Sequence, residues 1–422
     1  MSYAEDVLQQ IENSQFEGLK EKIDLSLKND DPEVVASLAE ELTAYGFSDY
    51  AKDIYRQLIA DFPDEDGLKV YLAEIFLNED KTDDGLQLLY GIHPDSDAYV
   101  QSLLVQADYY QSEGLVEAAE QKLLEATKLA PDEEIIWLAL AELLYAIGNY
   151  NNALEYYQKL IRADIRELSG VDINRRLANT WAHIGEFERA ADLIAQSNTD
   201  EMDINAQYEA GLIYLQADRV KEAIEAFSSV IEAQPDYVNV YPNLALAYQK
   251  QHDNDNVLAT AQIGLGYNKF DEVLYHLGSK AAANLGEKKT AIKLLEDGLA
   301  VNPDNSSLRL SLSNLYLSDA DYEKNIGLFD EIADEEIEDQ AHWNLAVSYD
   351  SLDELEKARQ HYLLAYRSFS SNSDFLLQVI RLFQETGDVT SLKLALTQYL
   401  RIQPEDFEMQ ELLSSLNDNE NE

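Results

Sequence analysis

Four acidic residues recur at a fixed interval of 34 residues in the first part of the chain: Glu40, Glu74, Asp108 and Glu142. A row of carboxylates could attract a basic segment of another molecule and steer its approach. The same residues could instead serve only the helices that carry them, because Ala-Glu pairs favour helix formation. The choice between these interpretations depends on the elements that position the four acids.

The sequence contains no motif for catalysis. It has no G-x-x-x-x-G-K-[ST], H-E-x-x-H or G-x-S-x-G pattern and no dinucleotide-binding glycine pattern. It has no Cys, and its six His do not form the i, i+4 pair of a helical metal site. The segment 252–256 begins like a Ca²⁺ loop but lacks the Gly and the Glu that such a loop requires. We therefore predict a protein that is not an enzyme and that has no cofactor and no metal site.

The charge of the chain is strongly negative. It has 31 Lys and Arg against 81 Asp and Glu, which gives a net charge of −50. Such a surface repels phosphate backbones and anionic membranes, so we predict no nucleic-acid partner and no membrane partner. The N-terminal segment lacks the basic and apolar regions of a secretory signal, and no apolar run approaches the roughly 18 residues of a membrane span. These features predict a cytoplasmic protein whose charge also favours solubility.

The elements that carry the acids follow from a second periodic feature. Pro63, Pro131, Pro235 and Pro303 are each followed by Asp, and both the first two and the last two lie 68 residues apart, twice 34. Two helices of about 12 residues, each with a short turn, occupy about 34 residues. Proline cannot continue a helix, and the following Asp offers a side-chain oxygen to free N–H groups. The pattern therefore predicts helical hairpins in which Pro-Asp closes one hairpin and caps the next.

The interior of each unit identifies a family. The clearest copy begins at Glu134, and its apolar and small residues occupy positions 4, 7, 8, 11, 15, 17, 20, 24 and 27: Trp137, Leu140, Ala141, Leu144, Gly148, Tyr150, Ala153, Tyr157 and Leu160. This pattern resembles the tetratricopeptide repeat family, in particular its bacterial, cytoplasmic, all-repeat members. The resemblance implies an all-α fold, a right-handed α-α superhelix of helical hairpins with no β-sheet.

The same frame extends over nearly the whole chain. Eleven copies are expected, and they begin near Pro32, Asp66, Val100, Glu134, Val171, Ile204, Val238, Glu272, Ser306, Asp339 and Ser373. We predict four parts: a degenerate helical pair at 1–30, an N-terminal part of the array with an acidic groove at 31–165, a C-terminal part at 166–404, and a capping helix with an acidic tail at 405–422.

One interval in the array is irregular. The copies that begin at Glu134 and Val171 are 37 residues apart, and the segment 196–202 is polar. Helix packing there cannot repeat the geometry of the neighbouring copies. We therefore expect the array to bend or hinge between residues 163 and 203.

In this family the first helix of each repeat lines the concave face, so positions 2, 5, 9, 12 and 13 would point there. In the first four copies these positions carry the four periodic acids together with Glu33, and no Lys or Arg. In the later copies the set becomes neutral, polar and aromatic. The predicted site residues of this second kind are Arg175, Asn179, Tyr208, Asn239, Lys280, Asn314, Trp343 and Arg381.

These two sets predict a groove of two characters. The acidic part would attract a basic segment, and the neutral part could hold a peptide backbone and apolar anchors. A clamp for a C-terminal carboxylate is disfavoured, because only Arg175 and Asn179 match its pattern and Glu209 departs from it. The sequence makes no prediction of oligomeric state.

We therefore predict a non-catalytic scaffold or adaptor that binds a partner protein or peptide, with a basic segment, in the concave groove. The resemblance leaves two alternatives open. One is a regulatory adaptor that delivers a client enzyme to a protease or complex. The other, more remote, is a chaperone-like or enzyme-associated role.

Overall fold

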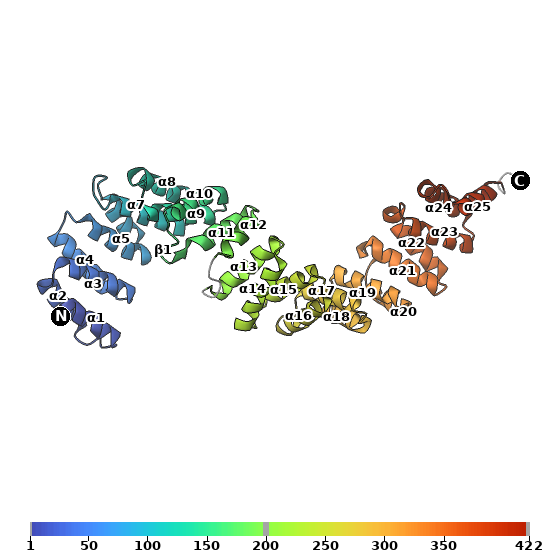
Figure 1. The fold of residues 1–422 in the computed structure, drawn as a ribbon, viewed down its shortest axis with the longest axis horizontal. Coiled ribbons are helices and arrows are strands. Elements are labelled where there is room, and N and C mark those ends of the chain that lie inside the picture. The colour runs from blue at the N-terminus through green and yellow to red at the C-terminus, as the bar shows by residue number, and fades with distance from the viewer. Residues whose placement is uncertain (1, 197–201, 419–422) are drawn as a thin grey trace. The chain divides into compact units, whose positions relative to one another are not determined.

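The computed structural model describes residues 2–196 and 202–418. The chain forms two compact units, residues 1–199 and 200–422, which we call the first unit and the second unit. Figure 1 shows each unit as a series of neighbouring helices that follow one another in chain order.

The helices of the first unit are α1 (Tyr3–Glu12), α2 (Leu19–Asn29), α3 (Pro32–Ala44), α4 (Ser48–Asp61), α5 (Asp66–Asn78), α6 (Thr82–Tyr90), α7 (Tyr99–Ser112), α8 (Val116–Leu129), α9 (Glu134–Ala146), α10 (Tyr150–Arg162), α11 (Ile173–His183) and α12 (Phe187–Ile194). Those of the second unit are α13 (Ile204–Gln216), α14 (Val220–Ala233), α15 (Val240–Lys250), α16 (Asn254–Tyr267), α17 (Glu272–Asn284), α18 (Lys288–Val301), α19 (Ser306–Ser318), α20 (Tyr322–Gly327), α21 (Asp339–Ser351), α22 (Leu355–Phe369), α23 (Ser373–Thr386), α24 (Val389–Ile402) and α25 (Phe407–Asp418).

The predicted all-α fold of helical hairpins is confirmed. Within the described ranges, each of the eleven predicted repeat starts lies within two residues of the start of a first helix, from α3 to α23. A helical pair, α1 and α2, precedes the array, and α25 follows it as the predicted capping helix.

Small and large side chains alternate in the core between the helices. Ala141 and Tyr157 are fully buried where α9 meets α10, and Gly148 follows α9 with a φ of +77° that favours glycine. At the position equivalent to Ala141, Gly211 of α13 lies so close to α14 that an added Cβ would come 2.4 Å from the ring of Phe227. The two helices of a hairpin can approach closely only because these positions are small.

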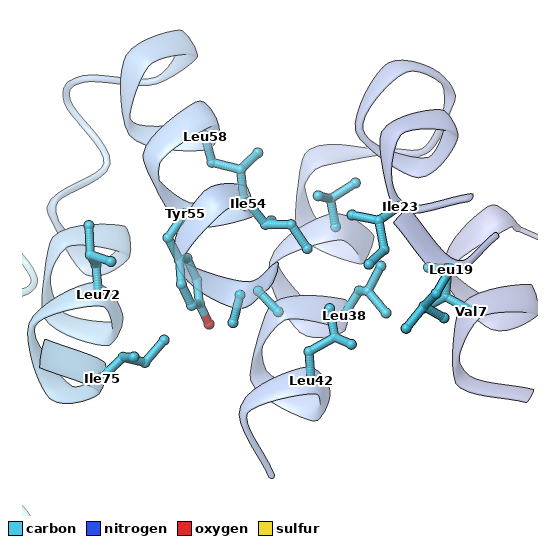
Figure 2. Packing of buried hydrophobic residues seen from close by; sticks show 14 of the residues in the cluster. Val7, Leu19, Ile23, Leu38, Leu42, Ile54, Tyr55, Leu58, Leu72 and Ile75 are labelled. Atoms are coloured by element: carbon cyan, nitrogen blue, oxygen red, sulfur yellow. The ribbon is translucent and has the colours of Figure 1, made fainter. Parts of the chain in front are cut away.

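One hydrophobic cluster joins successive helices from α1 to α5 in the first unit. Figure 2 shows Leu38 and Leu42 of α3 with Ile54 and Tyr55 of α4 on one side and residues of α5 beyond them. The N-terminal pair joins the same cluster through Val7, Leu19 and Ile23. Each hairpin therefore buries its apolar surface against its neighbours rather than in one central core.

The prediction that the Asp after each proline caps the next helix is wrong. Asp64 and Asp132 lie in turns, and α5 and α9 begin after Glu65 and Glu133 without a side-chain cap. At α19 the capping residue is Asn305, whose side chain accepts a hydrogen bond of 2.9 Å from the backbone N–H of Leu308. The proline and the Asp together form the turn, so the helix begins after both of them.

The expectation that the chain has no β-sheet is also wrong, at one place. Strands β1 (Glu167–Leu168) and β2 (Val171–Asp172) pair antiparallel between α10 and α11. Ser169 and Gly170 connect them with φ values of +51° and +77°. The hairpin lies in the 37-residue interval, where a longer connection has backbone groups that need partners. The bend expected between 163 and 203 includes residues 197–201, outside the described ranges, and stays a prediction.

The hairpin formed by α19 and α20 is the irregular member of the second unit. Its second helix, α20, has 6 residues and is followed by a 3-10 turn at Asp334–Glu336. Phe329 and Ile337 of this connecting segment are buried with Ala341 and Leu345 of α21. The segment 328–338 thus replaces the rest of a second helix.

Candidate functional site

The first helices of successive hairpins contact one another directly. Contacts join α3 to α5, α5 to α7 and α7 to α9 in the first unit, and α13, α15, α17, α19 and α21 in the second. We call the side of each unit that these helices line the first-helix face. The twelve predicted site residues belong to first helices or to the residues that cap them.

The first-helix face of the first unit is hollowed between α5 and α7. A cavity of about 440 Å³ lies there, which we call the α5–α7 cavity. Its lining combines acidic, apolar and neutral polar side chains, among them Glu74, Leu77, Gln101, Leu104, Asp108 and Ser112. These six residues stand at positions 2, 5, 9, 12 and 13 of two successive hairpins.

Three of the four periodic acids interact electrostatically at this place. Burial raises the pKa of Glu74, and the charges of Asp108 and Glu40 raise it further. Glu40 and Asp108 are exposed, whereas Glu74 is half-buried. A carboxylate that is partly desolvated and lies near two like charges is held at a cost in stability.

Glu142 has a different environment from the other three acids. Its carboxylate accepts a hydrogen bond of 2.6 Å from the hydroxyl of Tyr157 in α10. It also forms an ion pair of 2.9 Å with Arg176 of α11. The fourth acid of the series therefore links three helices within the first unit.

Several predicted residues of the second unit likewise join neighbouring helices. The Tyr208 hydroxyl of α13 donates to the backbone carbonyl of Asn239 at 3.3 Å and accepts from the Asn243 amide at 2.9 Å. The Asn344 amide of α21 donates to the Asn314 side chain of α19 at 2.7 Å.

The last two predicted residues make similar bonds. The Trp343 indole N–H of α21 donates to Gln378 of α23 at 2.8 Å, and its ring packs on Phe369 and Phe375. Arg381 of α23 forms an ion pair with Asp350 of α21.

The remaining predicted residues are placed as follows. Lys280 is exposed on α17, and Asn239 is exposed at the start of α15. Arg175 and Asn179 are half-buried on α11, and both interact with other residues.

Reasoning from the sequence missed two features, one in the lining of the α5–α7 cavity and one beside it. Leu77 and Leu104 stand at first-helix-face positions, but the predicted site contains only charged, polar and aromatic residues. Tyr71 of α5 was also missed; burial raises its pKa, and the charge of Glu40 acts in the same direction. The apolar residues at positions 5 and 12 of these repeats could have indicated the apolar part of the lining.

The described residues, 2–196 and 202–418, show neither a metal cluster nor a membrane-spanning helix. In those ranges, no group of three or more His, Asp or Glu is arranged to hold a metal ion. No helix in the described part of the chain is long and apolar enough to cross a membrane.

Comparison with known proteins identifies the family. The TPR repeat-containing protein YpiA of Bacillus subtilis is 31% identical over 371 residues, which cover 87% of this chain and 86% of that protein. The chain belongs to the tetratricopeptide repeat family. The resemblance found in the sequence is thereby confirmed, and tetratricopeptide repeat proteins generally mediate protein–protein interactions.

Family models give the same result for separate parts of the tetratricopeptide array. Residues 340–406 match the YpiA-like C-terminal tetratricopeptide repeats, and residues 111–165 match the YpiA-like tetratricopeptide repeats. General tetratricopeptide repeat models match residues 148–201, 204–237 and 276–339.

Two further proteins named for tetratricopeptide repeats are less similar to this chain. The TPR repeat-containing protein MJ1428 of Methanocaldococcus jannaschii is 22% identical over 247 residues, 47% of this chain and 44% of that protein. The crystal structure of the C-terminal part of a TPR repeat-containing protein from Cytophaga hutchinsonii is 13% identical. It has a TM-score of 0.42 and covers 64% of this chain and 97% of that one.

Proposed function

We propose that the chain is a non-catalytic interaction scaffold whose first unit binds a basic segment of a partner protein at the α5–α7 cavity. The observation that carries the proposal is Glu74, a half-buried carboxylate with a raised pKa beside the charges of Asp108 and Glu40. Residues that only stabilise a fold are not expected to lie in a repulsive arrangement of this kind. A cation from a partner would relieve it.

The shape and lining of the cavity favour a Lys or Arg side chain in particular. Such side chains place their aliphatic stem on apolar surface while their charged end meets polar groups. Leu77 and Leu104 offer apolar surface, and Glu74 and Asp108 offer carboxylates in the same cavity. A volume of about 440 Å³ is within the range of about 300–1,000 Å³ that is usual for binding pockets.

The energy of such binding should depend on salt. An exposed charge contact contributes about 0.2–1 kcal/mol, and screening weakens it as ionic strength rises. The half-buried Glu74 should contribute more than its exposed neighbours, because its charge is less screened. Association rate should fall with added salt as well.

The experiment begins with the protein that copurifies with the full-length chain in a fixed ratio from its source cells. Its affinity is then measured for a variant in which Glu74→Lys and Asp108→Lys are combined, at low and at high salt. We expect affinity at low salt to fall by about tenfold or more, with a smaller change at high salt.

A charge-matched variant serves as the control. Asp61→Lys and Glu155→Lys change the net charge equally, but on the exposed surfaces of α4 and α10, second helices of their hairpins. We expect the control to bind nearly as the native chain does. An equal loss of affinity in both variants would show that Glu74 and Asp108 act only through the overall negative charge of the chain. No loss of affinity in either variant would contradict the proposal.

A further inference from the structure

A second hollow lies at the edge of the first unit, where α4 ends and α5 begins. We call it the α4–α5 groove; its volume is about 480 Å³. Its apolar lining comes from three helices and a connection: Ala36 of α3, Leu58 of α4, Phe62 after α4, and Leu68 of α5. Phe62 is a large apolar residue of a kind usually buried in a core, but it is 41% exposed. The groove therefore presents apolar surface that the chain itself leaves open.

Three carboxylates line the same groove, and no Lys or Arg does. Asp31 and Glu33 lie at the start of α3, and Glu65 precedes α5. Among the described residues, none of the three forms an ion pair or a side-chain hydrogen bond with another residue. Acidic residues at a helix start interact favourably with the helix dipole. That interaction leaves carboxylate oxygens available to a partner.

The equivalent place in one hairpin of the second unit is filled by side chains of the chain itself. Between α19 and α21 the remaining volume is about 20 Å³. Leu310 stands at position 5 of that hairpin, as Ala36 does in the first, and Ile332 stands at position 27, as Leu58 does. Ile337, which is 9% exposed, closes the space from the irregular segment after α20. Here the chain supplies its own occupant, the apolar side chain of Ile337, which has extended backbone directly after the 3-10 turn.

We propose that the α4–α5 groove docks a segment of a partner protein in which an apolar side chain stands next to Lys or Arg. The apolar lining fits the side chain, as Ile337 fits the equivalent place between α19 and α21. The acidic rim fits the adjoining cation by charge complementarity. This site is separate from the α5–α7 cavity, so it does not depend on the function proposed for that cavity.

The test uses a displayed library of random 12-residue peptides, selected at low salt on the full-length chain. Enriched peptides are synthesised with a fluorescent label, and their affinities are measured by anisotropy. We expect them to share an apolar residue beside Lys or Arg. Ala36→Leu, which copies the filled groove, should lower their affinity at least tenfold. Ala300→Leu, the same change at an exposed position of α18, should leave it unchanged.

A second variant keeps the groove open but removes its charge. Glu33→Gln combined with Glu65→Gln should weaken the same peptides at low salt and much less at high salt. Thermal unfolding of each variant shows whether it still folds; loss of peptide binding by the charge variant in a folded chain supports the proposal even where Ala36→Leu unfolds.

Several results would overturn the inference. One is undiminished binding to both groove variants, and another is the absence of any enriched peptide. Loss of binding only in Glu74→Gln with Asp108→Asn would assign the peptides to the α5–α7 cavity, which supports the proposed function and contradicts this one. Self-association that Ala36→Leu abolishes would make the occupant a second copy of the chain and would also contradict it.

Discussion

On the first-helix face of the first unit, Glu74 lies half-buried beside two like charges, and its pKa is raised. In the second unit, Tyr208 of α13 donates a hydrogen bond to Asn239 at the start of α15, and Asn344 of α21 donates one to Asn314 of α19. Trp343 donates to the helix of the following hairpin as well. Residues of the first helices therefore separate into those that hold hairpins together and those that oppose the folded state.

The comparison suggests how one repeat can serve two purposes. A residue that bonds to the next hairpin cannot be released to a partner without loss of stability. A residue that is repelled by its neighbours gains from a partner of opposite charge. We therefore expect the residues that bind a partner to concentrate in the first unit and those that stabilise the fold to concentrate in the second. The following substitutions test that division.

The largest effect is expected at Trp343. Trp343→Ala removes the bond to Gln378 and the packing on Phe369 and Phe375, so it should destabilise the chain by about 3–5 kcal/mol. Urea unfolding followed by circular dichroism measures the loss. A loss below about 1 kcal/mol would mean that Trp343 is available to a partner, and the division between the units would fail.

The next largest effect is a loss of stability at acidic pH. Burial, with a smaller contribution from His342, lowers the pKa of His361 to about 4, while Asp334 acts in the opposite direction. The Nδ1 atoms of His342 and His361 are 3.0 Å apart, and Tyr349 stacks on His361. Because the unfolded chain binds this proton near pH 6.5, His361 should remove about 2 kcal/mol of stability between pH 7 and pH 5.

This pH effect is isolated by comparison with His361→Gln. The many carboxylates of the chain titrate in both proteins, so the difference between their two pH profiles reports the histidine. We expect the variant to lose less stability than the native chain as the pH falls from 7 to 5. Parallel profiles would show that His361 does not titrate as its burial predicts.

A smaller loss of stability is expected when Glu142, which forms an ion pair, is replaced. Glu142→Gln removes the ion pair with Arg176 and weakens the bond with Tyr157, so it should destabilise the chain by about 1 kcal/mol. Chemical unfolding at pH 7 measures it. A gain in stability would place Glu142 with the repelled acids and would extend the proposed binding surface to α9.

The smallest effect has the opposite sign. The raised pKa of Glu74 means that the folded chain binds its proton more readily than the unfolded chain does, so the ionised group destabilises the fold at pH 7. Glu74→Gln should therefore stabilise the chain, by about 0.5 kcal/mol, and the gain should disappear at pH 4. A destabilised variant at pH 7 would contradict the repulsion on which the proposed site rests.

The sequence predicted the frame of the fold well, because small and large residues at fixed positions leave one way to pair the helices. Gly148 and Tyr157, for example, specify where α9 ends and how α10 packs on it. The Pro-Asp caps were predicted wrongly, since the pattern locates a turn but not the residue at which the next helix begins. The truncation of α20 was missed, although Ser313 and buried Asn325 stand where other copies have small apolar residues.

The candidate site was less predictable. The repeat position indicates that Tyr208 and Glu74 each lie on the first-helix face of their own unit, but not that Tyr208 reaches across to the next hairpin. Nor does it indicate that Glu142 would meet Arg176, which depends on the longer connection before α11. The open α4–α5 groove depends on the sizes of Ala36 and Leu68, which come from different hairpins.

The most direct test compares one change from each unit in the same binding measurement. The affinity of the copurifying partner for the full-length chain is measured by calorimetry with Glu74→Gln and Asp108→Asn combined, and separately with Asn243→Ala. We predict that the first variant loses about tenfold in affinity at low salt without loss of stability, and that the second loses stability but binds the partner normally. Normal binding by the first variant together with weakened binding by a folded second variant would contradict the account.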